Sequence, residues 1–448
     1  MSTLKIAGLA AVVLAAGGGA ALLGGGKYVD SKTAALLEEL QTKVPGLELK
    51  NEVSTSSLFS RTGRLFVTYH LPIHSPDKTS QKAASVPLQL AADYEYSFSP
   101  AGTSGTFTKA ADWGNFHYLN FAGDFKAGLS DLQSAQIRID PLNLNSSGES
   151  FRRSLKLGKS ILNVSKDDSG KSELCYSFEN PNVILSTRTT SGSQSVEIKN
   201  LLWKSRPVPG QLLNVAEGHM TLDSLTLKSR PPEMQDAARS GDDAARMPPE
   251  RSAGAAERSY TLTGIDNITG IRDVDSSGLG ILYLKGSVNS IKENLISGSD
   301  QRLLPEFTNS RYDLTLEKIA AEPFMELQYQ SLINTIPEKK LRQLFPGEVT
   351  VEVKNLHTEI NSEKFDGAGT LQISPNKPPV DAVAEFKLSA SEKLLKSISN
   401  WQGIPEEWLQ KQLDEAVSAG FLTRKEGRCE TTFSLKERHL YLNNLRFM

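Results

Sequence analysis

Residues 64–71 read RLFVTYHL, and this stretch carries the pattern that decides the fold. Its alternate residues Leu65, Val67, Tyr69 and Leu71 are apolar, so an extended strand would place all of them on one face. The same alternation recurs in residues 87–97, 172–178, 195–203 and 219–227. No helical segment of a dozen residues separates these runs, although a parallel crossover needs about that length. The middle of the chain is therefore predicted to be an antiparallel sheet.

A phrase also recurs loosely among these runs. It reads VEIKNLLWKS from Val196, MTLDSLTLKS from Met220 and VEVKNLHTEI from Val351. Either a repeated strand unit stacks into a long curved sheet, or ordinary amphipathic strands happen to look alike. The predicted fold class is α+β, mostly antiparallel β, with an extended or curved sheet and a few C-terminal helices.

Helical spacing marks three other segments. Apolar residues recur at helical intervals from Val29 to Val44, before Pro45-Gly46, and predict a short amphipathic stalk helix that packs on its own domain or serves a membrane or dimer contact. A helix pair is predicted over residues 325–345, with a restart at Pro337. A last helix is predicted from Pro405 to Gly420, followed by a closing hairpin from Cys429.

The segment before the stalk has the composition of a membrane span. Residues 6–26 carry no charge, and as a helix they would cross the roughly 30 Å hydrocarbon layer of a bilayer. We expect an uncleaved anchor, because the apolar run continues past the small residues Ala15-Ala16-Gly17 at which a signal peptide could be cut. A cleaved signal peptide is the alternative. Paired glycine runs in this segment are compatible with self-association, and so with a homo-oligomer.

Residues 229–260 interrupt the strand pattern. They contain two Pro-Pro pairs and no apolar period, which predicts a disordered insertion or linker. The expected organisation is a cytoplasmic tail (1–5), a transmembrane helix (6–26), an amphipathic stalk helix (27–52), a β-rich periplasmic region (53–228), the insertion (229–260) and a C-terminal β region with helices and a closing hairpin (261–448).

Charge and cysteine content exclude several classes of protein. Lys plus Arg number 50 and Asp plus Glu 52, so the chain has no global positive field that would hold nucleic acid or anionic lipid. Cys175 and Cys429 are too few for a disulfide framework or a four-ligand zinc site. We expect buried thiols, with one long-range bridge as the alternative.

Motifs that would carry chemistry are incomplete. His70 and His74 lie four residues apart, but Pro72 between them removes helical ligand spacing. Gly158-Lys159-Ser160 resembles the end of a phosphate loop, yet Arg153 stands where that loop needs glycine. We predict no catalytic residue, no metal ligand and no cofactor site, while an unrecognised pair of hydrolytic carboxylates stays a distant alternative.

Three stretches resemble the YdgA/YihF-like family of uncharacterised bacterial envelope proteins. They are Ser57-Leu58-Phe59-Ser60, where that family usually has glycine first and a second serine at the place of Arg61; LLPEFTNSRYDLTLEKI at 303–319; and the C-terminal helix with its closing hairpin. In the hairpin, Asn444 replaces the family's turn glycine, and asparagine tolerates the left-handed conformation. The resemblance implies an inner-membrane anchor and a periplasmic domain, and it brings no catalytic residues.

Two functions of different classes follow as expectations. The first is a membrane-anchored, non-catalytic binding or scaffold protein of the bacterial envelope, which contacts an envelope protein or polymer. The second is a lipid or amphiphile carrier with an apolar groove along the sheet, which requires that the helices around Met325 and Trp408 leave that face uncovered.

Overall fold

The structure is a computed structural model of the chain. It describes residues 37–38, 41–42, 46–57, 59–72, 85–99, 102–115, 117–127, 132–148, 151–166, 174–189, 192–208, 211–230, 257–297, 300–303, 306–324, 343–374, 381–401, 404–436 and 439–446. The anchor segment 6–26 lies outside these residues. No helix among the described residues is long and apolar enough to span a bilayer.

Antiparallel strands make up most of the described chain. They are β1 (Leu47–Ser56), β2 (Ser60–Pro72), β3 (Ser85–Ser99), β4 (Gly102–Lys109), β5 (Phe121–Ala127), β6 (Leu132–Ile139), β7 (Leu142–Ser147), β8 (Phe151–Leu157), β9 (Ser160–Lys166), β10 (Leu174–Thr189), β11 (Gly192–Val208), β12 (Gln211–Arg230), β13 (Glu257–Arg272), β14 (Leu279–Ser297), β15 (Asp300–Leu303), β16 (Phe307–Ala320), β17 (Val349–Ile360), β18 (Glu363–Ser374), β19 (Asp381–Ser391), β20 (Thr423–Lys425), β21 (Arg428–Lys436), β22 (His439–Leu442) and β23 (Leu445–Arg446). Two helices, α5 (Glu392–Trp401) and α6 (Glu406–Ser418), lie between β19 and β20.

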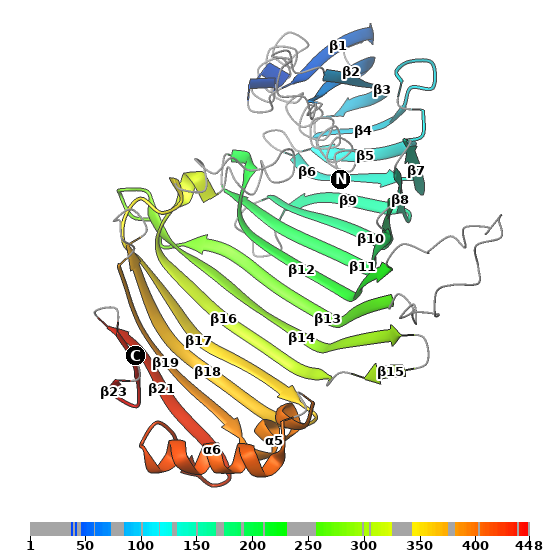
Figure 1. Ribbon diagram of the computed structural model, residues 1–448. Helices are drawn as coiled ribbons and strands as arrows, with labels where there is room; N and C mark the ends of the chain where they lie inside the picture. The colour runs from blue at the N-terminus through cyan, green and yellow to red at the C-terminus, as the bar shows by residue number, and fades with distance from the viewer. Residues whose placement is uncertain are drawn as a thin grey trace, which may run out of the picture.

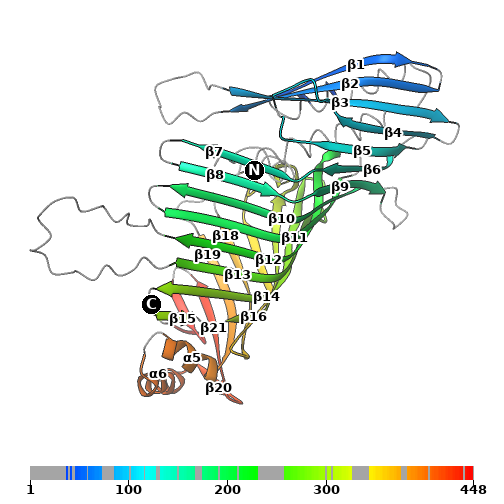
Figure 2. The ribbon, with the colours of Figure 1, turned by 90° about the vertical axis from the view of Figure 1, so that its right-hand side faces the viewer.

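The strands form one twisted and curved sheet with a nearly sequential order (Figures 1 and 2). β1 to β6 pair in sequence, β9 joins β6 to the first half of β10, and the β7–β8 hairpin joins the second half of β10. From β10 to β19 neighbours in the chain are neighbours in the sheet, except that β15 pairs only with the end of β14. The predicted antiparallel sheet with a few helices is confirmed.

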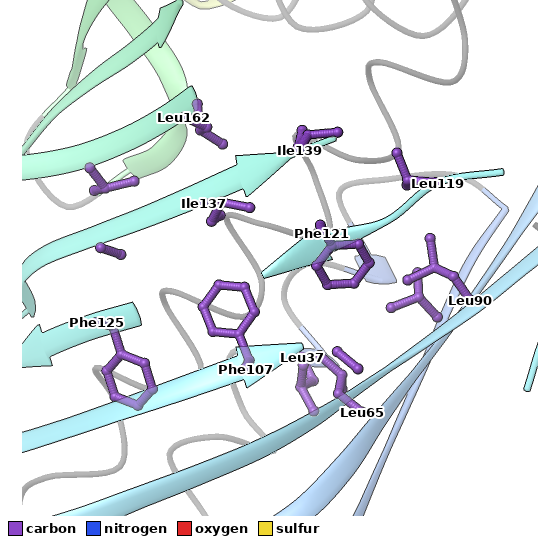
Figure 3. Close-up of a cluster of buried hydrophobic side chains, with 14 of the residues drawn as sticks. Leu37, Leu65, Leu90, Phe107, Leu119, Phe121, Phe125, Ile137, Ile139 and Leu162 are labelled. Atoms are coloured by element: carbon purple, nitrogen blue, oxygen red, sulfur yellow. The ribbon is translucent and has the colours of Figure 1, made fainter. Parts of the chain in front are cut away.

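The opening stretch forms the strand that its alternation predicts. In β2, Leu65, Val67 and Tyr69 are at most 5 % exposed. They belong to a buried cluster that spans β1 to β10 and includes Phe107, which Figure 3 shows beside aromatic and aliphatic neighbours. Leu37 belongs to the same cluster, so this part of the predicted stalk packs on its own domain. Residues 47–52 belong to β1 and not to a helix, because the chain reverses at Gly46 and pairs with β2.

Glycines inside the strands face aromatic rings on the neighbouring strand. A Cβ atom at Gly286 would lie 2.5 Å from Tyr312 Oη, and one at Gly123 would lie 2.2 Å from Phe107 Cζ. Each ring therefore fills the space that its partner glycine leaves, which restores packing at a residue that otherwise weakens a strand. The pairs in this arrangement are Gly63–Tyr94, Gly105–Phe125, Gly123–Phe107, Gly270–Tyr283, Gly286–Tyr312 and Gly369–Phe386.

Residues in several long strands adopt the left-handed backbone conformation at the same level of the sheet. Asn200 in β11, Gly264 in β13 and Asn309 in β16 have φ of 51°, 57° and 51°, in the left-handed region. The registers on either side place these residues in one row with Asp223 and Asn289, and Asn200 Nδ2 donates to Asp223 Oδ2 at 2.6 Å. We call this the bend row, and Figure 2 shows the long strands bending along their length.

The alternation of apolar residues shifts by one residue where the chain crosses the bend row. In β11, Val196 and Ile198 are followed by Leu201 and Trp203, a step of three in place of two. The phrase that recurs in the sequence contains a step of three each time; in β11 and β12 the step lies at the bend row, whereas in β17 it lies at Lys354 and Asn355, away from that row. The phrase therefore marks the place where a strand contains one extra residue and still keeps its apolar side chains on one side of the sheet.

The remaining sequence predictions differ at their boundaries. β12 continues to Arg230 and β13 begins at Glu257, so the insertion interrupts one antiparallel pair and its core, 231–256, lies outside the described residues. Of the predicted helix pair over 325–345, residues 325–342 are not described; the helical residues 321–324 precede it. The predicted helix at 405–420 is α6, and Gly420 follows it with φ 78°. The helix α5 was missed.

The closing hairpin matches its prediction. Asn443 and Asn444 connect β22 to β23 with φ of 48° and 66°. Two successive positive φ values are characteristic of a type I′ turn, in which asparagine followed by glycine is preferred. Asn444 adopts the conformation that glycine would take.

Replacing Gly369 by alanine should destabilise the protein by about 1–3 kcal/mol, because the new Cβ would overpack the strand interface. That atom would lie 2.3 Å from Glu385 O and 2.5 Å from Phe386 Cδ1. Gly347→Ala is the matched control, since a Cβ there has nothing within 4 Å. The measurement is the urea midpoint of the purified full chain. Equal midpoints for the two variants would contradict the expected clash.

Candidate functional site

The register places the apolar side chains of the long strands on one face. β18 and β19 pair without interruption, so Gly367 and Gly369, two positions apart in β18, point to the same side of the sheet. Their partners in β17 are Leu356 and Val353, respectively. Leu356 and Val353 therefore point to the same side although three positions separate them. In β14, a step of three across the bend row likewise keeps Leu284, Val288 and Ile291 on the same side of the sheet.

We call this side of the sheet the apolar face. Before the bend row it carries Leu142, Leu157, Val183, Ile198, Leu225, Leu262, Ile291, Phe307 and Ile360. The rows after the bend carry Phe178, Trp203, Met220, Asn267, Gly286, Tyr312, Leu356, Gly367 and Leu388, and then Tyr176, Ser205, Gly218, Thr269, Leu284, Leu314, Val353, Gly369, Phe386 and Phe433. These rows contain no Asp, Glu, Lys or Arg.

Separate elements cover the two ends of the apolar face. At one end Ala321 and Phe324 pack with Ile271, Ile319 and Val349. At the other end Leu394 of α5 packs on Ile360 and Ala390. Of the two helices that the carrier alternative requires to leave this face uncovered, α6 has Trp408 52 % exposed, and the one around Met325 lies outside the described residues.

The middle of the apolar face has no second layer among the described residues. Leu356 is 41 % exposed and Phe307 is 37 % exposed, and their neighbours in the middle rows are half-buried. A soluble protein rarely leaves contiguous apolar surface of this extent uncovered, so such a surface usually marks a binding region. The residues of this face are the candidate functional site.

The opposite side of the sheet is polar and is cross-linked between strands. The Asp366 carboxylate accepts hydrogen bonds from His357 Nδ1 at 2.6 Å and from Arg428 Nη2 at 2.5 Å. Partial burial opposes ionisation of Asp366, but the two hydrogen bonds outweigh it and lower the pKa of the carboxyl group. On the same side, partial burial and a hydrogen bond to Glu217 raise the pKa of Tyr283. Side-chain hydrogen bonds of this kind connect β12 with β14, and connect β18 with both β17 and β21.

A hollow of about 790 Å³ lies on this polar side, where β6, β9, β10 and β11 meet. Its lining mixes both signs of charge, with Arg138 donating to Asp124 at 2.8 Å and His219 paired with Asp266 at 2.7 Å. Because these charges neutralise one another, the hollow has no single-sign character that would select a ligand.

The described residues of the incomplete motifs lie in strands and turns of the sheet. His70 Nε2 lies 3.2 Å from Glu48 Oε1 across β1 and β2, while His74 is outside the described residues. Gly158 is in the turn between β8 and β9, where its N–H donates to Asn182 O at 2.7 Å. Cys175 in β10 and Cys429 in β21 are both free thiols. The described residues contain no cluster of three metal-ligating side chains.

Comparisons of the chain with protein-family models, curated proteins and solved structures give no match.

Asp366→Asn should lower stability at neutral pH by on the order of 1 kcal/mol, because two charge-assisted hydrogen bonds lose their anionic acceptor at a half-exposed position. The folded-state pKa of Asp366 lies below its ordinary value of 3.8. Its contribution is thus present above that value and is lost as the pH falls through the lowered pKa. The difference in unfolding free energy between wild type and variant should shrink from pH 7 to about pH 3.

The control is Glu322→Gln, which removes one negative charge at an exposed position with no ion pair to the described residues. A pH-independent difference between wild type and Asp366→Asn would show that shape, and not the charge of Asp366, accounts for the loss.

Proposed function

We propose that this chain is a non-catalytic, amphiphile-binding protein of the bacterial envelope that holds lipid-like apolar chains against the apolar face. The observation that carries the proposal is a single-layered sheet with one charged side and one side whose middle rows lack charge. Water solvates the charged side, whereas the apolar side gains free energy by contact with hydrocarbon, at about 25 cal/mol per Å².

The length of the strands suits an acyl chain. From Gln194 to Pro207, β11 extends over roughly 40 Å at the usual rise per residue, which exceeds the ~30 Å hydrocarbon thickness of a bilayer. An extended acyl chain, which spans half of that thickness, can therefore lie along one strand. Because the apolar rows cross many strands, several chains can lie side by side.

The proposed location is the periplasmic side of the inner membrane, with residues 6–26 as the anchor. It rests on the uncharged composition of that segment and on the resemblance to the YdgA/YihF-like family. A tether would keep the apolar face near a source of lipid.

A protein scaffold is the second candidate. Its support is the edge strand β1, which among the described residues pairs only with β2 and is exposed over much of its length. An edge strand with unpaired backbone groups is a place where another chain can add a strand.

Photocrosslinking from adjacent positions separates these candidates. A photoreactive benzoyl-phenylalanine at position 284 lies on the apolar face, and the same group at position 285 lies on the polar face of the same strand. In cells that express the full chain, we expect a lipid adduct from position 284 and none from position 285, as measured by mass spectrometry. The anchor segment is identical in both variants, so lipid around it cannot produce the difference.

A protein adduct from position 284 would favour the scaffold. Absence of adducts from both positions, in protein with wild-type thermal stability, would contradict amphiphile binding.

A further inference from the structure

Arginines line one end of the apolar face. The outermost row on this face runs across Ser146, Arg153, Thr187, Gln194, Ser229, Arg258 and Leu295. It lies just beyond the apolar row that contains Leu155, Leu185, Val196 and Leu227. Arg153 and Arg258 are exposed. The outermost row thus places two arginines among mostly polar side chains, one row beyond the apolar residues.

Two further arginines occupy the same strand ends on the polar side. Arg152 of β8 pairs directly with Arg188 of β10, and both are exposed. Like charges directly opposite each other on neighbouring strands destabilise a sheet. We call Arg152, Arg153, Arg188 and Arg258 the arginine rim.

The described residues provide little negative charge against this rim. Arg152, Arg153 and Arg188 make no ion pair with a described carboxylate, and Arg153 lies over the Phe151 ring at 5.3 Å. Glu293 is the acid in the next row, where it accepts a hydrogen bond from Tyr260, which is also hydrogen-bonded to Arg258. Positive charge therefore predominates where the apolar face ends.

We propose that the arginine rim binds the phosphate of an anionic lipid headgroup while the acyl chains extend from it along the strands of the apolar face. The inference rests on the proposed function and adds the class of amphiphile and its direction. Guanidinium groups bind phosphate oxygens through paired hydrogen bonds, and an anionic ligand would relieve the repulsion between Arg152 and Arg188. The other end of the face, closed by Phe324 and its neighbours, has no comparable basic row among the described residues.

The test uses the purified full chain with the photoreactive group at position 284. It is mixed with vesicles of equal parts phosphatidylglycerol and phosphatidylethanolamine, and the adducts are counted by mass spectrometry. We expect the anionic lipid to predominate severalfold. In the variant Arg152→Gln, Arg153→Gln, Arg188→Gln, the ratio of phosphatidylglycerol to phosphatidylethanolamine adducts should fall severalfold, to near one, because basic residues near a membrane surface each add to anionic-lipid affinity.

The matched control removes the same number of cations elsewhere. Lys204, Lys285 and Lys354 are exposed on the polar side, away from the rim, and their change to Gln should leave the ratio unchanged. The ratio tests the rim, whereas the total yield of adducts tests the apolar face. A wild-type ratio near one, or an equal fall in both triple variants, would overturn the rim and leave amphiphile binding intact. Loss of all lipid adducts in the wild type would overturn both proposals.

Discussion

The structure depends on one constraint: every long strand must keep its apolar side chains on the same side of a sheet that bends. A strand of regular alternation would have to bend smoothly or turn some apolar residues toward the charged side. At the bend row several neighbouring strands step by three residues at the same level, with Asn200, Gly264 and Asn309 in the left-handed conformation. From β11 to β16 the steps coincide and the register across the bend row is unbroken, whereas the step from Val353 to Leu356 in β17 stands alone and shifts the register with both β16 and β18.

The two sides of the sheet are stabilised differently. The polar side uses hydrogen bonds and ion pairs between strands, such as the contacts of Asp366 with His357 and Arg428. Among the described residues, the chain itself buries the apolar side around Phe107, around Ile319 and beneath α5. Between these clusters the sheet holds its shape by backbone pairing and by rings that fill the space above glycines.

Local patterns in the sequence predicted the elements better than their assembly. Alternation from Leu65 to Leu71 predicted a strand, and Pro405 and Gly420 marked the ends of a helix. The start of α5 was readable from Ser391, whose side chain caps the N–H of Leu394, but the preceding strand pattern hid it. The apolar face could not be derived from any single run. It depends on which residues pair between strands. Leu356 and Val353 are three positions apart in β17, and only their pairing with Gly367 and Gly369 of β18 shows that they share a face.

The nearly sequential order of the strands has a consequence for how such a protein can fold and change in length. Most contacts join strands that are adjacent in the chain, so ordering can spread from one hairpin to the next without closing long loops. Stability is then close to a sum over neighbouring pairs, as in solenoid proteins. Adding or deleting a hairpin whose strands carry the shift at the bend row would lengthen or shorten the apolar face without rebuilding the rest. The extent of this surface is thus an evolvable quantity, set by how many hairpins the gene encodes.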